Sequence, residues 1–197
     1  MNNRRVVVTG MGALTPIGNT LQEYWQSLVN GVSGAAPITH FDATNFKTKF
    51  ACEVKGFEAA DFIHKKEARK LDKFSQYALV VAEEAVKASK IDLENMDADR
   101  AGVVWGSGIG GMETFFNGTV DFGRGDGQPR FNPFFIPKLI SDIPAGHISI
   151  KYNFRGPNFT TVSACASSTN ALIDAFNYIK WNKADFFIAG GSEACIF

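Results

Sequence analysis

Residues 160–168 read Thr160-Thr161-Val162-Ser163-Ala164-Cys165-Ala166-Ser167-Ser168, in which a β-branched run gives way to small residues around a cysteine. The β-branched half predicts a strand over Phe159 to Ser163. The apolar spacing that follows predicts a helix from Cys165 to Trp181. A strand that turns directly into a helix is the repeating unit of α/β proteins, so we predict an α/β fold with a mostly parallel sheet.

Outward from this segment, further apolar runs end in glycine and predict three more strands, at Arg4 to Thr9, Ala101 to Trp105 and Phe186 to Ala189. A capping box at Thr20 to Glu23 predicts a helix that Gly31 closes, and a longer helix is predicted from Leu71. Each predicted helix carries an apolar stripe that we expect to be buried: Leu21, Tyr24, Trp25 and Leu28; Leu71, Phe74, Ala78, Val81, Ala82, Ala85 and Val86; Leu172, Ala175, Phe176 and Ile179.

Composition excludes several classes of protein. The 197 residues hold 20 Lys and Arg against 20 Asp and Glu, so no overall basic field attracts nucleic acid or a membrane surface. Three widely spaced cysteines form no disulfide or zinc framework, and no apolar run approaches the roughly 20 residues that span a bilayer. We expect a cytoplasmic protein without metal or cofactor. The 18 Phe residues indicate a dry interior, an apolar ligand channel or a buried subunit interface.

Cys165 is the strongest candidate for chemistry. A thiol at a helix N-terminus faces the positive end of the helix dipole, which favours the thiolate. Small neighbours let an acyl group approach the sulfur, as in the strand–turn–helix elbow that carries other nucleophiles. The alternative is a small cysteine buried under the helix start. Cys52 and Cys195 lack this setting, and we expect both to be packing residues.

Gly106-x-Gly108-x-x-Gly111 follows a predicted strand and formally matches the dinucleotide-binding fingerprint. The acidic residue that should follow about 20 positions later is not well placed, because Asp121 and Asp126 lie in or near a glycine-rich loop. A tight loop and a glycine-rich wall beside a substrate channel are the other interpretations. Gly10-x-Gly12 is a weaker match still.

Several motifs together give the chain a family resemblance. Ala164-Cys165-Ala166-Ser167 after a strand resembles the active-site motif of β-ketoacyl-acyl carrier protein synthases, most closely the elongating synthase II type. The resemblance covers the whole chain. It includes residues 5–18 (RVVVTGMGALTPIG), 106–111 (GSGIGG), 133–137 (PFFIP), 145–147 (AGH), 155–157 (RGP) and 189–191 (AGG).

The resemblance implies a thiolase-like layered fold, of which residues 1–197 would be the N-terminal half of a duplicated αβαβα architecture, paired as a homodimer. It implies that Cys165 takes an acyl chain from acyl carrier protein. Malonyl-carrier protein would then lose CO2 and attack the acyl-cysteine, as in fatty acid elongation. The family's two catalytic histidines and its second oxyanion donor belong to the C-terminal half. The histidines of this chain match neither motif, and we expect His147 to be structural: His40, His64 and His147.

Two further sites follow from the resemblance. Gly108 and Ile109 would line the acyl pocket together with residues near Phe134 and Phe135 of the partner subunit. The dense basic run over residues 65–70 is by itself most simply a solvated helix start. The family docks acidic acyl carrier protein in this region, which would make a docking surface of Lys66, Arg69 and Lys70.

Other interpretations remain open. A polyketide-type ketosynthase shares these motifs, whereas chain-length factors lack the cysteine that this chain keeps. An NAD-dependent oxidoreductase would need a better placed acid. The polypeptide could also be a fragment that is catalytically incomplete without the histidines. Because the chain stops after its last predicted strand, we expect residues 1–197 alone to expose large apolar areas.

Overall fold

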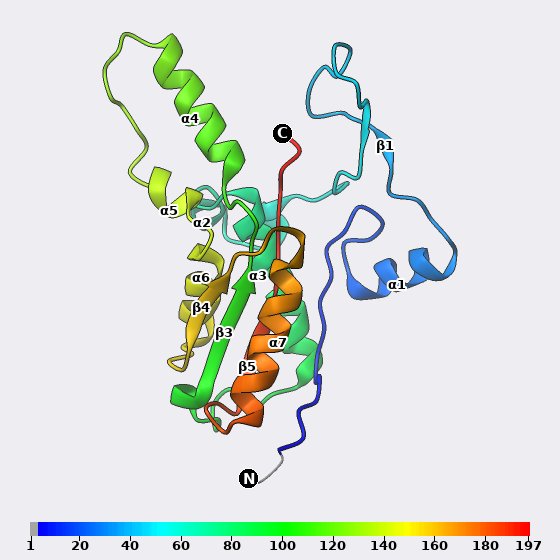
Figure 1. Cartoon of the computed structure of the whole chain (residues 1–197), viewed down its shortest axis with the longest axis vertical. Helices are drawn as coiled ribbons and strands as arrows, with labels where there is room; N and C mark the ends of the chain where they lie inside the picture. Colours follow the sequence, from blue (N-terminus) through cyan, green and yellow to red (C-terminus); the bar gives the residue numbers. More distant parts are fainter. Residues whose placement is uncertain (1–3) are drawn as a thin grey trace.

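A parallel sheet of three strands forms the centre of the computed structural model, which describes residues 4–197 (Figure 1). The central strand β3 (Ala101–Gly106) pairs on one side with β4 (Asn158–Thr161) and on the other with β5 (Phe186–Gly191). Both pairings are parallel, which confirms the predicted sheet. Since β4 and β5 flank a strand that precedes both, the chain crosses over β3 between them.

Helices cover both faces of the sheet, as expected for parallel strands (Figure 1). All six residues of β3 are buried. Val103 and Trp105 belong to one apolar cluster with side chains of two helices, α3 (Lys73–Ser89) and α6 (Ile143–Tyr152). The other face carries α7 (Ser167–Lys180), which packs on β3 and β5. The long helix predicted from Leu71 is confirmed as α3, although it begins at Lys73. Five of the seven predicted stripe residues are buried: Leu71, Phe74, Ala78, Ala82 and Val86.

The face that α7 turns to the sheet differs from the predicted apolar stripe. Ala171 and Ala175 are buried, whereas Leu172 and Phe176 expose 53% and 44% of their surface. Small side chains face the strands because the helix lies very close to them. The prediction was wrong for these large residues because helical periodicity identifies an apolar face but not the layer that it contacts.

Gly106, the last residue of β3, shows how close this approach is. A Cβ atom built on Gly106 would lie 2.5 Å from the carbonyl carbon of Ser167 and 2.6 Å from the nitrogen of Ser168. Both atoms belong to backbone, which cannot move aside as a flexible side chain would. Only glycine therefore lets the first turn of α7 rest on the end of the strand.

The predicted strand at Arg4 to Thr9 does not form. This segment is extended but pairs with no strand in the part of the chain that the structure describes, and Val7 and Val8 are exposed. Just beyond it, Gly10 and Gly12 pass directly over the backbone of α3. The β-branched composition was read correctly as extended backbone, but extended backbone becomes a strand only beside a partner.

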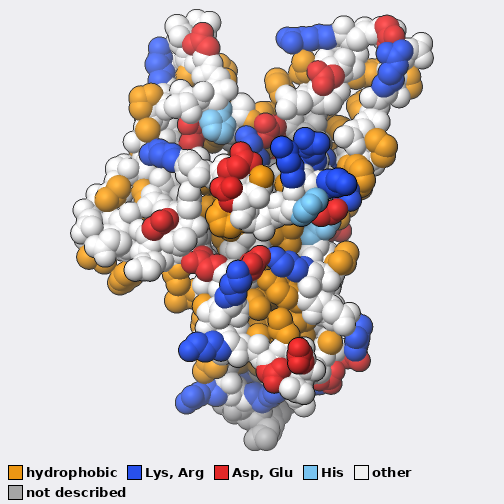
Figure 2. Space-filling model, turned by 180° about the vertical axis from the view of Figure 1, so that it is seen from behind, with side chains coloured by type: hydrophobic (Ala, Val, Ile, Leu, Met, Phe, Trp, Pro, Cys, Tyr) orange, Lys and Arg blue, Asp and Glu red, His pale blue; other side chains and the backbone are white. Residues whose placement is uncertain are grey.

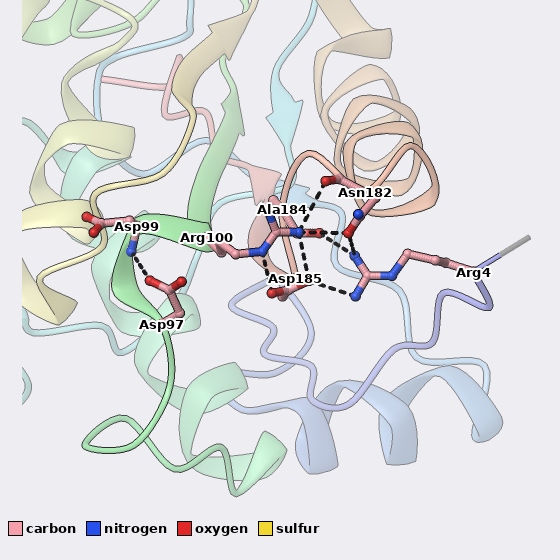
Figure 3. Close-up of polar contacts among 7 residues, drawn as sticks. All are labelled: Arg4, Asp97, Asp99, Arg100, Asn182, Ala184 and Asp185. Atoms are coloured by element: carbon pink, nitrogen blue, oxygen red, sulfur yellow. Dashed lines mark hydrogen bonds and ion pairs between the residues drawn. The ribbon is translucent and has the colours of Figure 1, made fainter. Parts of the chain in front are cut away.

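Arg4 binds this segment to the loop between α7 and β5 (Figure 3). Its guanidinium donates to Asp185 at 2.7 Å and to Asn182 at 2.8 Å, and Arg100 binds the same Asp185 carboxylate at 2.6 Å and 3.0 Å. The pKa of Asp185 is lowered from 3.8 to about 2, mainly by the hydrogen bond from Arg100. The ionised carboxylate therefore stabilises the fold above about pH 4, and this contribution is lost as the pH falls towards 2.

The other elements surround this centre. Thr20 caps the first helix as predicted by accepting from Glu23 N–H, but the Glu23 carboxylate accepts from Asn19 rather than from Thr20. Three helices, at residues 112–124, 135–139 and 143–152, and the two short antiparallel strands were not predicted from the sequence. The remaining bounds are α1 (Leu21–Val29), β1 (Ala36–Pro37), β2 (Phe50–Ala51), α2 (Lys65–Ala68), α4 (Met112–Arg124) and α5 (Phe135–Leu139).

Large apolar side chains are exposed over much of the chain, as expected for residues 1–197 alone. Hydrophobic groups lie between the charged ones on the face seen in Figure 2. All residues of α1 are partly or fully exposed, so its predicted stripe is not buried. Within residues 4–197, no helix is long and apolar enough to cross a membrane. The most exposed large apolar residues are Ile150, Val8, Trp25, Val29, Val162, Phe50 and Trp181.

We predict that Gly106→Ala destabilises the fold by about 2 kcal/mol or more, because the added methyl group overpacks the contact between β3 and α7. Urea unfolding followed by circular dichroism measures the change. Gly123→Ala is the matched control, since a Cβ at Gly123 meets no atom within 4 Å and the residue lies in α4. It should raise the stability by up to about 1 kcal/mol. Equal stability of the two variants would contradict the packing argument.

Candidate active site

Cys165 lies in the connection between β4 and α7. Residues Ala164–Ala166 form a 3-10 turn there, and α7 begins at Ser167. The predicted helix start at Cys165 was therefore two residues early. The thiol is exposed rather than buried under the helix, and it stands at the N-terminal end of a 14-residue helix. This placement supports the nucleophile interpretation over that of a packed cysteine.

The turn that carries Cys165 is strained and braced. Ala164 has φ +51°, a left-handed conformation that costs a residue with a Cβ about 1–2 kcal/mol. Ser167 holds the turn: its buried hydroxyl accepts from Ser163 N–H at 2.8 Å and donates to the Ala164 carbonyl at 2.7 Å. Strain that the surroundings maintain in this way is typical of functional sites.

Two more side chains fix the ends of the turn. The Thr161 hydroxyl donates to the Ser167 carbonyl at 2.8 Å, and the Asn170 amide donates to the Ser163 hydroxyl at 2.6 Å. The sequence analysis missed the roles of Ser167 and Asn170. The signal was present in part, since hydroxyl residues beside a turn commonly bond to nearby backbone groups.

The loop after β3 lies beside this turn, because a Cβ on Gly108 would be 3.8 Å from the Cα of Ala164. The N–H groups of Gly108 and Ile109 donate to the carboxylate of Glu193, and Gly110 N–H donates to the Ser107 hydroxyl. A dinucleotide pyrophosphate would need these same donors. Since a carboxylate of the protein already occupies them, the loop is not a dinucleotide site. Glu193 is a site residue that sequence analysis did not single out.

The predicted pocket residues fall in two places. Gly108 and Ile109 lie next to the Cys165 turn, and Ile109 exposes 48% of its surface. Phe134 and Phe135 lie at the start of α5, where the rings of Phe131 and Phe135 are 5.1 Å apart. Within one chain, Gly108 and Ile109 thus lie beside the nucleophile, whereas Phe135 belongs to a separate aromatic group and Phe134 lies under the Lys70 ammonium group.

The predicted docking residues lie on and just after α2, with Lys66 and Arg69 exposed. Figure 2 shows Lys and Arg side chains gathered in the middle of one face, with acidic and His side chains beside them. Lys70 is less free than its neighbours. Its ammonium group binds Glu67 at 2.9 Å and lies 5.7 Å from the centre of the Phe134 ring. That hydrogen bond is the main cause that lowers the pKa of Glu67.

A model of one protein family, described as "Beta-ketoacyl synthase, N-terminal domain", matches residues 3–197. The chain belongs to this family. The 3-oxoacyl-[acyl-carrier-protein] synthase 2 of Staphylococcus aureus is 47% identical over 194 residues, which are 98% of this chain and 47% of the relative. The enzyme of the same name from Synechocystis sp. is 42% identical over 197 residues, all of this chain and 47% of the relative. The chain thus spans about half the length of these relatives.

Solved structures show the fold of the beta-ketoacyl synthase family in the same residues. The ishigamide ketosynthase/chain length factor matches with a TM-score of 0.89 and 27% identity, over 98% of this chain and 48% of that one. A type II PKS acyl-carrier protein in complex with its ketosynthase matches with a TM-score of 0.83 and 25% identity, over 97% and 51%. The fold is therefore the predicted thiolase-like layered α/β fold.

The other two cysteines correct an expectation. Cys52 and Cys195 were predicted to be packing residues, yet both are exposed. Cys52 follows the edge strand β2, and Cys195 lies beyond the end of β5, so neither belongs to a packed layer. Partial burial, followed by the charge of Glu193, raises the pKa of Cys195. In this beta-ketoacyl synthase domain, exposure alone does not separate the three thiols, whereas position at a helix N-terminus does.

Two of the domain's histidines have local roles. His147 is half-buried in α6, and its burial lowers the pKa of the imidazole, with the Glu67 charge opposing this effect. His64 caps α2 by accepting from Lys66 N–H through Nδ1 at 3.3 Å.

We predict that Ser167→Ala loosens the Cys165 turn, because Ser163 N–H and the Ala164 carbonyl lose a shared partner. The unfolding free energy should fall by about 1–2 kcal/mol, and the Ser163 amide should exchange its hydrogen faster. Hydrogen exchange resolved by residue measures both effects. Ser168→Ala, one position along the same helix, is the control. Unchanged exchange at Ser163 in Ser167→Ala would show that the hydroxyl does not brace the turn.

Proposed function

We propose that residues 1–197 are the N-terminal half of a β-ketoacyl-acyl carrier protein synthase that elongates fatty acyl chains. One observation carries the proposal. Cys165 stands exposed on a braced turn at the N-terminus of α7, in a chain that belongs to the family and keeps the cysteine of its motif. The relatives named 3-oxoacyl-[acyl-carrier-protein] synthase 2 match over nearly the whole chain and support the same activity.

The chemistry begins with acyl transfer. The Cys165 thiolate attacks the carbonyl carbon of an acyl thioester on acyl carrier protein, and the Cys165 N–H stabilises the oxyanion that forms. The bond between the carbonyl carbon and the carrier's sulfur then breaks, and the sulfur leaves as a thiolate that takes up the proton lost by Cys165. The acyl chain remains on Cys165. Malonyl-carrier protein next loses CO2, and the resulting carbanion attacks the acyl carbon and releases Cys165. The histidines and the second oxyanion donor for this step would come from the C-terminal half.

The acyl pocket would form between subunits. Gly108 and Ile109 lie beside the nucleophile and supply one wall. Phe134 of the partner subunit and Phe135 of the partner subunit would supply the other in a homodimer. The exposed apolar side chains of residues 4–197 and the 18 Phe residues support such an interface.

Acyl carrier protein would dock on Lys66, Arg69 and Lys70. These cations are near one another on α2 and the residues that follow it, and two are exposed. A local patch lets a protein of zero net charge select an acidic partner. A solved relative is described as a ketosynthase in complex with its acyl-carrier protein, which supports a partner of this kind.

The cytoplasm suits the proposed enzyme, since its three free thiols belong in a reducing compartment. Condensation through an acyl-cysteine requires neither metal nor cofactor.

A polyketide-type ketosynthase is the alternative function. The ketosynthase of a type II PKS shares the fold with a TM-score of 0.83, although at 25% identity. The identities of 42–47% to the synthase 2 enzymes favour fatty acid elongation. Mass spectrometry of the product on the carrier distinguishes the two functions. Fatty acid elongation gives a saturated chain with one new keto group, whereas polyketide synthesis gives a chain with several keto groups.

We predict that iodoacetamide labels Cys165 well before Cys52, which lies at no helix N-terminus, and before Cys195, whose pKa is raised by burial. Cys165→Ala should abolish acyl loading from acyl-CoA, whereas Cys52→Ala should leave loading within about twofold of the unmodified protein, because Cys52 lies away from the helix N-terminus. Peptide mapping after timed alkylation and intact mass after acyl loading measure the two effects. Equal labelling of all three thiols in the folded protein would sink the assignment.

We predict that charge reversal at Lys66, Arg69 and Lys70 weakens binding of acyl carrier protein by about tenfold or more at low salt. The loss should shrink as salt rises, because the charges are exposed. Lys66 and Arg69 should contribute more than Lys70, which Glu67 already neutralises. Titration calorimetry measures the affinity. Reversal of three exposed lysines elsewhere is the control, and equal losses in both variants would refute a specific patch: Lys47, Lys90 and Lys183.

A further inference from the structure

Glu193, two residues after the end of β5, binds the loop that follows β3. Its Oε2 accepts from Gly108 N–H at 2.5 Å and from Ile109 N–H at 3.2 Å, while Oε1 accepts from the Ser107 hydroxyl at 3.4 Å. Both carboxylate oxygens are therefore used by a single loop. Hydrogen bonds to an ionised acceptor are about twice as strong as neutral ones. One side chain thus holds a loop that lies 85 positions earlier in the chain.

Ser107 extends the contacts of Glu193 to a third residue of the loop. This side chain is 2% exposed, and its hydroxyl oxygen also accepts from Gly110 N–H at 3.1 Å. Glu193 and Ser107 together bind the backbone of residues 108–110. The conformation of the loop consequently depends on one carboxylate and one buried hydroxyl.

The anchored loop lies beside the turn that carries the nucleophile. A Cβ on Gly108 would lie 2.8 Å from Oε2 of Glu193 and 3.8 Å from the Cα of Ala164. The side of Gly108 on which a Cβ would stand thus faces both the carboxylate and the residue that precedes Cys165. Without the carboxylate, Gly108 and Ile109 are free to shift relative to the thiol. A displacement of about 1 Å near reacting atoms can cost about 100-fold in rate.

We propose that Glu193 is a positioning residue for acyl transfer to Cys165, and that it acts by holding the Gly108–Ile109 loop against the Ala164–Cys165 turn. The inference rests on the proposed function, since it concerns the acyl loading of Cys165. Glu193 acts through the loop, because its recorded hydrogen bonds all go to residues 107–109. Its effect reaches an acyl chain through the wall that Gly108 and Ile109 form.

The experiment compares two reactions of Cys165 in the full-length expressed protein. Loading from a long-chain acyl-CoA requires the loop, whereas alkylation by iodoacetamide requires only the thiol. We expect Glu193→Ala to lower the rate constant of loading by about 100-fold and to change alkylation by less than about twofold. Glu94→Ala, which removes an exposed carboxylate from a distant loop, should leave both rates unchanged.

Glu193→Gln should restore loading to within about fivefold, because an amide oxygen can accept both N–H groups and the amide nitrogen can donate to Ser107. A purely structural role would lower the alkylation and the loading of Glu193→Ala together, along with its melting temperature. That pattern would overturn the proposal, as would wild-type loading in folded Glu193→Ala.

If Glu193→Ala does not fold, Glu193→Asp replaces it. The shorter side chain keeps the charge but cannot reach Gly108 without movement of the loop. The rate of acyl loading should therefore fall again, while the rate of alkylation stays within about twofold of the wild-type rate. Loading at the wild-type rate in Glu193→Asp would overturn the proposal. The variant Cys165→Ala tests the proposed function separately. If it still loads acyl groups, Cys165 is not the nucleophile and the proposed function is wrong. That result would also refute the proposed role of Glu193, since this role concerns the loading of Cys165.

Discussion

The whole site depends on the backbone contact between the end of β3 and the first turn of α7. Glycine at position 106 brings the helix start onto the edge of the sheet where all three parallel strands end. The loops that leave these strands then meet: Gly108 from β3, Cys165 from β4 and Glu193 from β5. Convergence of loops at the carboxyl ends of parallel strands is the general reason that α/β proteins place their sites there.

Much of the fold could be predicted because its central elements obey local rules. Strand β3 is apolar throughout, and α3 keeps a helical apolar spacing, so both were found from sequence. Errors arose where a partner decides the outcome. Residues 4–9 are β-branched but have no neighbouring strand, and the large apolar residues of α7 face away from the sheet because only Ala171 and Ala175 fit against it. Periodicity records that a face is apolar, not what covers it.

The site divides in the same way. Cys165 could be recognised because its turn and its small neighbours are contiguous in sequence, and the family motif lies in the same nine residues. Glu193 could not be recognised, since its partners lie 84 to 86 positions away and nothing in the local sequence marks them. Lys70 was identified as a surface charge. Its pairing with Glu67, three positions earlier, follows a local spacing that could have been predicted, whereas its position over the distant Phe134 ring could not.

The strand order has a consequence for how the site comes into being during synthesis. Because β3 lies between two strands made after it, its N–H and C=O groups have no ladder partners while the ribosome adds the next fifty residues or so, to β4 at Asn158–Thr161. Contacts between residues so far apart in sequence form slowly, because the entropy of closing a long loop is lost before the contacts contribute any stabilising free energy. The nascent loop at Gly108 waits longer still, until Glu193 emerges. Within residues 4–197, the loop beside the nucleophile is thus anchored only after β5 has been made, so that a chain interrupted before β5 carries the cysteine without this anchor.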